Sequence, residues 1–543
     1  MRSFRGRHVL VAVLAILSGR ALADGEHEHA HDTPDKFGQV HFRTSCKPET
    51  QAAFERGVAL LHSFAYVKSA ATFQEVSAKD PACGMAQWGV AATYFHTIWG
   101  PPTDDEFAAG RTAAQKAAQL GAPTAREKDY IGAIGAYYQG DGVPHPVRVV
   151  AYEKAMAGVH ERNPDDHEAA IIHALAMLGV AYNSPPDKTY ARQREAAKIL
   201  NRLLKLEPEH PGIAHYMIHS FDYPEVAELA LPAARAYAKI APSAPHALHM
   251  PSHIFTRLGM WQDSIDSNLA SARTAQAWLA KTNPGATAFD ALHAWDYLEY
   301  AYLQTGQDAK AKEMAGTVAK VTSFDIPQFA AAYALAAVPA RYALERREWK
   351  EAAAVTAQPA TFPWAKYPYA KAIVHFARAV GAARAGQVEA AQKDVAALAE
   401  IQSSLKGQKG FDWATQVEIQ RRVAAAWLSR AEKKDAEAVA LMRSAAELED
   451  STDKHPVTPG SILPAREQLA DLLVELGQPV AALTEYETSL RSAPARFNSY
   501  DGAARAAERA GHKQQAKVFR EKLAALCGGT VPARAGPAMT AAQ

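Results

Sequence analysis

The sequence predicts an all-α protein: a solenoid in which helical hairpins stack into a right-handed superhelix. Three observations predict this fold. The chain is rich in alanine, and 48% of its 543 residues are hydrophobic, which suits a large helical core. Glycines at turn positions recur 34 residues apart, as Gly477 and Gly511 do. Short glycine-containing turns also precede Ala- or Ser-rich segments, as in "RLGMWQDSIDS" and "RAGQVEAAQKD".

The spacing within these segments is that of the tetratricopeptide repeat (TPR). In "LGQPVAALTEYETSLRSAP", Ala482 and Tyr486 occupy positions of the second repeat helix, and in "HAWDYLEYAYLQTG", Trp295 and Tyr302 occupy positions of the first. One such hairpin cannot bury its apolar face alone, so neighbouring hairpins must stack. We expect about ten to twelve TPR-like helix pairs between residues 45 and 526.

The amino-terminal residues predict export. Arginines at the start, an apolar run from Val9 to Leu17 and the small-residue site Ala21-Leu22-Ala23 are typical of a secretory signal, residues 1–23, cleaved after Ala23. The apolar run is shorter than the about 20 residues that span a bilayer, and no later charge-free segment reaches that length. We therefore expect a periplasmic or secreted protein without a transmembrane segment.

The remaining chain divides by composition. Residues 24–44 form a His-rich segment expected to be disordered, 45–320 a first TPR-like array, 321–526 a second array, and 527–543 a disordered tail. The formal net charge is +1, and loss of the four arginines of the signal leaves the chain slightly acidic. This charge does not fit a nucleic-acid-binding protein. The oligomeric state is not predicted by these features.

The three cysteines contain no metal-binding or haem-attachment spacing. Cys46 and Cys83 each precede a predicted helix, and the two helices should be neighbours. Because export permits disulfides, we predict a bridge between them, with two unpaired buried thiols as the alternative. On the chain-entropy model such a bridge contributes roughly 3–4 kcal/mol to stability. Cys527 is left over.

Three blocks of the chain, "LLHSFAYVKSA", "HPGIAHYMIHSFD" and "PHALHMPSHIFTRLGMW", each contain histidine, and the last two contain three each. They resemble blocks of a group of exported bacterial tetratricopeptide proteins, and the resemblance covers roughly residues 40 to 310. It implies the fold and export, and it implies no particular activity.

In tetratricopeptide arrays the first helix of each hairpin lines a concave groove. The repeat register, carried over to this chain, places polar residues of three successive hairpins on that groove: His215, His219, Asp222 and Tyr223; His246, His249, His253 and Arg257; and His293, Asp296 and Tyr300. Spacings of three and four keep such residues on one helical face. Pro251 breaks the middle helix in this register, so that helix is expected either to kink or to begin there.

One interpretation of this histidine-rich groove is a metal site. The candidate ligands are His215, His219, His249, His253 and Asp296. Imidazole ligands suit zinc, copper, iron or nickel, and the sequence does not choose among these. The amino-terminal His27, His29 and His31 are a further, looser metal-binding tract, or simply a compositional feature.

Two other interpretations remain open. The imidazoles can hydrogen-bond between hairpins, a structural role also assigned to His62, His96 and His173. Alternatively, the groove can bind an extended peptide through the candidate ligand-binding residues His246, Arg257, Asp222, Tyr223, His293 and Tyr300. Peptide-clamping repeats use Lys and Asn where this chain has His, so that analogy is incomplete.

The predicted function is therefore an exported TPR scaffold that binds a protein or peptide partner through a His-rich groove, with a transition metal as a candidate cofactor. The alternative is a metal-dependent hydrolase or oxidoreductase that uses the same His/Asp cluster. The chain contains no nucleophile elbow, HExxH motif, phosphate-binding loop or dinucleotide fingerprint. An enzymatic activity is consequently not predicted, and no catalytic residue is assigned.

Overall fold

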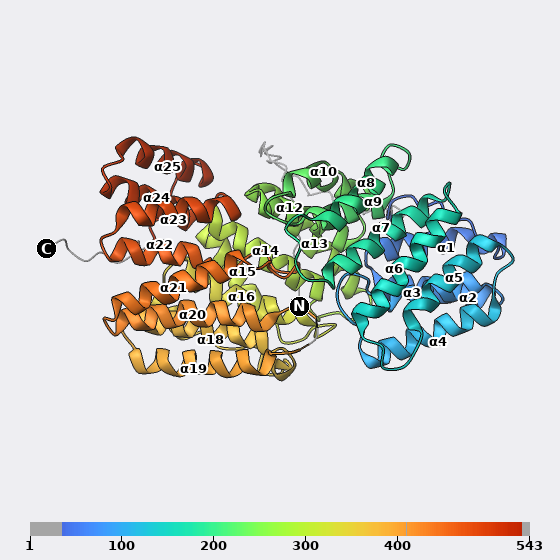
Figure 1. Cartoon of the computed structure of the whole chain (residues 1–543), viewed down its shortest axis with the longest axis horizontal. Coiled ribbons are helices and arrows are strands. Elements are labelled where there is room, and N and C mark those ends of the chain that lie inside the picture. Colours follow the sequence, from blue (N-terminus) through green and yellow to red (C-terminus); the bar gives the residue numbers. More distant parts are fainter. Residues whose placement is uncertain (1–34, 409, 535–543) are drawn as a thin grey trace, which may run out of the picture. The chain divides into compact units, whose positions relative to one another are not determined.

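A computed structural model describes residues 35–408 and 410–534. Within these ranges the regular secondary structure is helical, apart from one isolated bridge between Thr287 and Phe324. Successive helices pack side by side as hairpins, and the hairpins stack along the chain (Figure 1). The predicted all-α solenoid is confirmed.

The helices have the following bounds. From the amino terminus they are η1 (Pro48–Thr50), α1 (Gln51–His62), α2 (Tyr66–Lys79), α3 (Gly84–Thr93), α4 (Asp104–Leu120), α5 (Ala125–Tyr138), α6 (His145–Arg162), α7 (His167–Tyr182), α8 (Ala191–Leu203), α9 (Pro211–Phe221), η2 (Ala227–Ala230), α10 (Leu231–Ile240), α11 (Pro245–His249), α12 (Pro251–Arg257) and α13 (Trp261–Ala280). They continue with α14 (Phe289–Gln304), α15 (Asp308–Ala319), α16 (Phe329–Glu345), α17 (Trp349–Ala353), η3 (Trp364–Lys366), α18 (Pro368–Arg384), α19 (Val388–Leu405), α20 (Trp413–Ala431), α21 (Asp435–Asp450), α22 (Ala465–Glu475), α23 (Pro479–Ser492), α24 (Phe497–Arg509) and α25 (Lys513–Leu526).

Alternate helices also contact one another, as the first helices of stacked hairpins do. Contacts run from α1 to α3 and on to α5, from α7 to α9, and through every even-numbered helix from α14 to α24. The stack also meets itself, because α9 contacts α1 and α14 contacts α24. Segments far apart in the sequence are thereby brought next to α9, α11, α12 and α14.

The histidine-bearing helices are shaped by their prolines. Pro211 occupies the first position of α9, where its missing N–H is not needed, and His210 caps that helix. Pro251 ends α11 and begins α12, as expected from its missing donor. Met250 between them keeps helical dihedral angles, φ −53° and ψ −35°. His249 and His253 therefore stay on one face despite the break. His246 and His249 lie on the short helix α11, ahead of the helix that begins at Pro251.

The two chain ends differ from prediction where they are described. Phe37 and Phe42 are buried, and Arg126 lies 4.5 Å from the centre of the Phe42 ring. At the other end, Arg534 is ion-paired with Asp308. Residues 35–44 and 527–534, which were predicted to be disordered, therefore contain side chains that contact the helices. The predicted signal, its cleavage site and His27, His29 and His31 lie outside the described residues.

The described cysteines behave as predicted, with Cys46 and Cys83 disulfide-bonded and Cys527 unpaired. The boundary between two arrays that was predicted at residue 320 stays a prediction. Helices α14 and α16, which lie on either side of it, pack against each other. None of the helices in the described part of the chain is both long enough and apolar enough to span a membrane.

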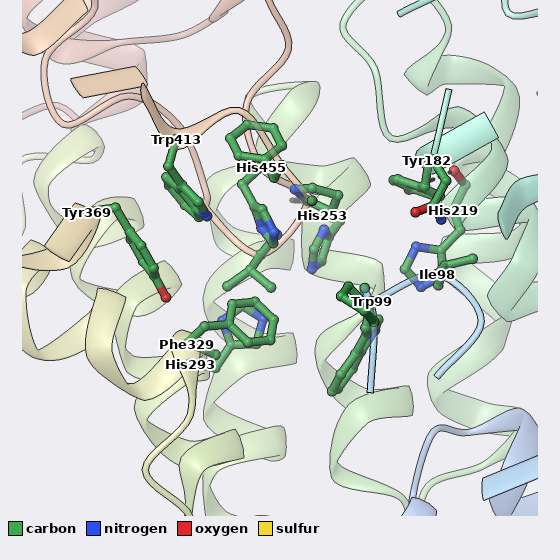
Figure 2. Close-up of a pocket in the computed structure, with 18 of the residues that line it drawn as sticks. Ile98, Trp99, Tyr182, His219, His253, His293, Phe329, Tyr369, Trp413 and His455 are labelled. Atoms are coloured by element: carbon green, nitrogen blue, oxygen red, sulfur yellow. Dashed lines mark hydrogen bonds between the residues drawn. The ribbon is translucent and has the colours of Figure 1, made fainter. Parts of the chain in front are cut away.

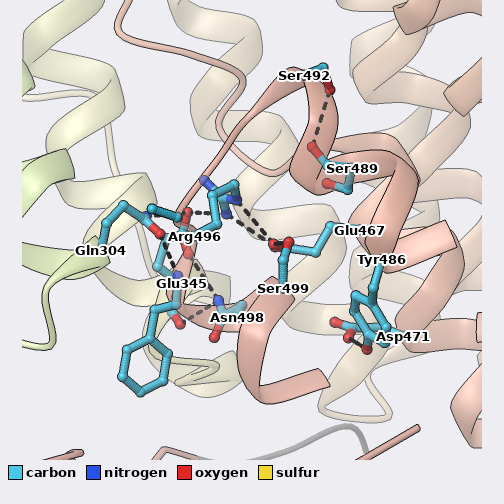
Figure 3. Close-up of polar contacts among 12 residues, drawn as sticks. Gln304, Glu345, Glu467, Asp471, Tyr486, Ser489, Ser492, Arg496, Asn498 and Ser499 are labelled. Carbon is cyan, nitrogen blue, oxygen red and sulfur yellow. Dashed lines mark hydrogen bonds and ion pairs between the residues drawn. The ribbon is translucent and has the colours of Figure 1, made fainter. Parts of the chain in front are cut away.

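A buried ion-pair network joins the carboxy-terminal helices to α14 and α16 (Figure 3). Arg496, fully buried ahead of α24, bonds Glu345 of α16 at 2.7 Å and Glu467 of α22 at 3.0 Å. It also donates to the hydroxyl of Tyr300 on α14 at 2.7 Å. Asn498 completes the network by bonding the second oxygen of Glu345. Four helices are thus connected through one guanidinium group.

Candidate metal centre

A pocket of about 780 Å³ lies against the histidine-bearing helices (Figure 2). On one side its lining residues include Trp99 and Tyr182, and on the other Tyr369, Trp413 and His455. The imidazoles of His219, His246, His253 and His293 also face it. A pocket of this size suits a small molecule.

The first triad consists of His215 and His219 on α9 and His246 on α11. Nε2 of His215 lies 3.0 Å from Nε2 of His219 and 3.1 Å from Nε2 of His246. One ligand atom from each residue lies within 4.8 Å of the others. The spacing of four on α9 and the packing of α11 beside it place three imidazoles around one point.

The second triad consists of His249 on α11, His253 on α12 and His293 on α14. Nε2 of His249 lies 3.0 Å from Nε2 of His253, and the ring centres of His249 and His293 are 4.2 Å apart. Its ligand atoms also fall within 4.8 Å of one another, and all three residues are buried. The two triads adjoin, with ring centres of His246 and His249 6.3 Å apart.

Hydrogen bonds at the opposite ring nitrogens fix the tautomers. Nδ1 of His253 lies 2.9 Å from the carboxylate of Asp222, and Nδ1 of His249 lies 2.6 Å from Oδ1 of Asn268. The Asn268 amide donates to the Ser264 carbonyl, so its oxygen is the atom that accepts from His249. Both histidines therefore carry their proton on Nδ1 and present the Nε2 lone pair to the centre of the triad.

The same holds for His215, whose Nδ1 donates to the backbone carbonyl of His62 at 2.6 Å. Burial lowers the pKa of His215, His249 and His253, with neighbouring imidazoles lowering those of His215 and His249 further. For His253 the Asp222 carboxylate opposes this without reversing it. The imidazoles are thus held neutral, which is the protonation state of a metal ligand.

Asp222 orients the second triad through its hydrogen bond with His253. Besides His253, it bonds Nε of Arg257 at 2.9 Å, and Nζ of Lys454 lies 3.6 Å away. These contacts keep the pKa of the buried carboxyl well below its usual range, with Lys454 and Arg257 as the main charges. Burial in turn lowers the pKa of Lys454 to about 7. Asp222 is therefore a buried carboxylate that orients a histidine, and it does not face the pocket.

Four predicted site residues take other places. Asp296 accepts from Arg341 of α16 at 2.5 Å and does not belong to either group of ligand atoms. Tyr300 is buried at Arg496, and Arg257 is bound to Asp222, so neither presents a free group to a peptide. Tyr223 is half-buried beside Tyr190, with ring centres 4.7 Å apart. The repeat register therefore predicted which helices border the pocket, but it did not predict which of their side chains face it.

His62, Glu168 and His210 form another close group, with a different character. Glu168 bonds His62 at 2.9 Å and His210 at 2.6 Å, one carboxylate oxygen to each. Nδ1 of His62 meets the hydroxyl of Tyr216, and Nδ1 of His210 accepts from a backbone N–H. Every polar atom of this group has a partner, as expected for the structural role assigned to His62.

Several residues of the site were not singled out from the sequence. Trp99, Asp290, Tyr369, Trp413 and His455 line the pocket, Asn268 bonds His249, and Lys454 lies near Asp222. His246 and His293 were placed in the groove but not among the metal ligands. Asp290 lies one turn before His293 on α14, and burial raises its carboxyl pKa to about 7. The clustering of aromatic residues in "FPWAKYPYA" and "GFDWA" was the one available signal for the far wall.

No family model matches the chain, and no curated protein is similar to it. Solved structures with some likeness include the human IFIT1 dimer with m7Gppp-AAAA, at a TM-score of 0.37 and 12% identity over 82% of this chain and 90% of that one. Yeast Tom70 gives a TM-score of 0.33 and 12% identity over 87% and 96%. The TPR domain of P58(IPK) gives 0.21 and 11% identity over 86% and 99%. Likeness at this level carries no argument about activity, and the absence of a nucleic-acid partner stays a prediction.

Proposed function

We propose that this solenoid binds transition-metal ions through the two triads, one ion in each. The observation that carries the proposal is the contact between His249 and His253. Their Nε2 atoms lie 3.0 Å apart, while both Nδ1 atoms donate to other acceptors. Two lone pairs facing each other at this distance repel, and a shared cation removes that repulsion. A proton is disfavoured there because burial lowers the pKa of both imidazoles.

The donor set indicates which ions fit. Each triad offers three imidazole nitrogens and no thiolate or carboxylate, a set that suits zinc, copper, iron or nickel. In metal-binding histidines the second ring nitrogen commonly donates a hydrogen bond to a carboxylate or carbonyl oxygen, as Nδ1 of His253, His249 and His215 does here. These contacts support a metal site built into the fold.

The test is metal analysis of the whole protein, purified without a histidine tag. We expect about two ions per chain. The His219→Ala variant should lose the ion of the first triad and His253→Ala that of the second, with the double variant losing both. His167→Ala, which removes a partly exposed histidine paired with Glu207, serves as the matched control. If neither zinc nor copper binds at micromolar concentration, the proposal is wrong.

A metal-dependent enzyme is the second candidate function. With three protein ligands, each ion keeps a coordination position for water or substrate, as catalytic zinc sites do. The pocket borders both triads, so this position is reachable by a small molecule. Azide added to the copper-loaded protein tests the point, since an open position gives a changed visible or paramagnetic-resonance spectrum. An unchanged spectrum at saturating azide would exclude direct access of substrate to the ion.

We further propose that the protein is exported and that a protein or peptide partner binds elsewhere on the solenoid surface. The Cys46–Cys83 bridge supports export, because disulfides persist in oxidising compartments. Stacked helical hairpins in general offer extended surfaces for partners. Mass analysis of the protein from the periplasmic fraction should give a chain beginning after Ala23. Retention of the first 23 residues in the cytoplasm would contradict export.

A further inference from the structure

The wall of the pocket opposite Trp99 and Tyr182 is built of stacked rings. Trp413, the first residue of α20, lies parallel to Tyr369 with ring centres 4.0 Å apart and 10° between the planes. On its other side His455 stacks at 5.0 Å and 16°. Phe329 closes the stack edge-on to His455 at 5.3 Å. These rings come from four segments, α16, α18, α20 and the loop between α21 and α22 (Figure 2).

The wall on the other side of the pocket is also aromatic. Trp99 lies edge-on to His246 of the first triad, with ring centres 5.9 Å apart, and edge-on to Phe329 at 6.3 Å. Tyr182 lies beside His219 of the same triad at 6.5 Å. Aromatic residues therefore extend from both walls to the imidazoles, which leaves a space suited to a flat ring.

The polar residues that line the pocket include four imidazoles of the triads and Asp290, and also Asn183, Ser184, Lys366 and His455. Asp290 and His293 both line it from adjacent turns of α14, so the carboxyl group is next to a proposed metal ligand. A pocket with apolar walls and a small number of placed polar groups is the usual form of a small-molecule site. The polar end of a bound molecule is therefore expected at the triads, and its apolar part between the aromatic walls.

We propose that the pocket binds a phenolic molecule, with its ring between the aromatic walls and its oxygen directed to the metal centre. The phenolic oxygen is a donor for the open coordination position, and the Asp290 carboxylate accepts the hydrogen bond of the hydroxyl group. This assignment rests on the proposed metal-binding function. It names the substrate class of that site: a phenol, as opposed to a peptide or an aliphatic acid.

The test compares 4-nitrophenol with nitrobenzene, which has the same substituted ring without the hydroxyl group. Both are titrated into zinc-loaded protein whose metal content has been measured, with quenching of tryptophan fluorescence as the readout. We expect 4-nitrophenol to bind at least tenfold more tightly than nitrobenzene. Trp413→Leu should weaken both ligands about tenfold, and Asp290→Ala should reduce the preference for 4-nitrophenol. Trp278→Leu, remote from the pocket beside Phe37, is the matched control.

The outcomes separate the two proposals. If the protein holds its metal but binds the two ligands equally, the phenol assignment is wrong while the metal centre stands. Equal binding of 4-nitrophenol before and after metal removal also overturns the assignment, because the oxygen then has no metal partner. Thermal unfolding of each variant accompanies the titrations, and Asp290→Ala replaces a polar residue at the pocket, so it tests the assignment even if Trp413→Leu fails to fold.

Discussion

The histidines of this chain differ in what their second ring nitrogen contacts. In His62 and His210 both nitrogens have partners of matching donor and acceptor character, through Glu168, Tyr216 and a backbone amide. In His249 and His253, Nδ1 donates to Asn268 or Asp222 and the Nε2 atoms face each other, with the Tyr297 hydroxyl 3.4 Å from Nε2 of His253. The residue type and its burial are the same in both groups, so the pattern of hydrogen bonds is what distinguishes the structural imidazoles from the proposed metal ligands.

A first prediction concerns Asp222. Asp222→Asn removes the charge that holds the Nδ1 proton of His253, so we expect the metal affinity of the second triad to fall about 10–100-fold. Competition with a chromophoric chelator measures it. Asp394→Asn is the control, because Asp394 holds His375 in the same way at 2.8 Å, outside the triads. Equal affinities of the two variants would show that Asp222 does not tune the metal site.

A second prediction concerns pH. Burial lowers the pKa of the triad histidines below 6.5, so the unfolded chain binds more protons than the folded one as pH falls below that value. Their contribution is therefore present above about pH 6.5 and is lost on acidification. In metal-free protein the free energy of unfolding should decrease from pH 7 to pH 5. A His249→Gln/His253→Gln variant should show a shallower decrease, and an equal slope would contradict this account.

At the scale of elements, the repeat register was informative within a hairpin. It predicted that His215 and His219 share a face of α9, and that a break occurs at Pro251. The register could not predict which side of α14 stays open, because His293 and Asp296 are both buried and only their neighbours distinguish them. His293 meets imidazoles, whereas Asp296 meets Arg341. Propensity and periodicity contain no information about that difference.

A third prediction concerns the network that joins four helices. Arg496→Met leaves the carboxylates of Glu345 and Glu467 buried without their shared cation. We expect the free energy of unfolding to fall by about 3–5 kcal/mol, as measured by urea denaturation. Arg505→Met, which breaks an exposed pair with Asp501 on α24, should cost less than about 1 kcal/mol. Similar losses in the two variants would contradict a structural role for the buried network.

At the scale of the whole molecule, the pocket depends on the way the solenoid meets itself. Residues 451–464, between α21 and α22, bring Lys454 to Asp222 and His455 to the pocket. The Thr458 carbonyl accepts from the Tyr297 hydroxyl at 3.2 Å. The Lys188–Asp453 ion pair at 2.5 Å fixes this loop to the segment before α8. A repeat pattern describes neighbouring hairpins, so the sequence could predict the histidine-bearing side of the pocket and not the side formed by Tyr369, Trp413 and His455.

The last prediction tests this connection. Lys454 is buried near Asp222, and burial lowers its pKa to about 7, so it is an ammonium group below pH 7 and neutral above it. A positive charge beside the second triad opposes the binding of a cation. The metal affinity of the intact protein should therefore rise more steeply from pH 6.5 to pH 8 than that of Lys454→Met, and the variant should bind metal more tightly at pH 6.5.

Chelator competition at the two pH values measures both effects. Lys188→Met is the matched control, because it removes a lysine that contacts the same loop from a more exposed position. Lys454 and the triad histidines are about 200 residues apart in sequence. If the pH dependence of metal affinity changes only in Lys454→Met, the carboxy-terminal half of the chain sets the charge beside the triads. Identical pH dependence in both variants and the intact protein would mean that the triads bind metal independently of the loop that covers them.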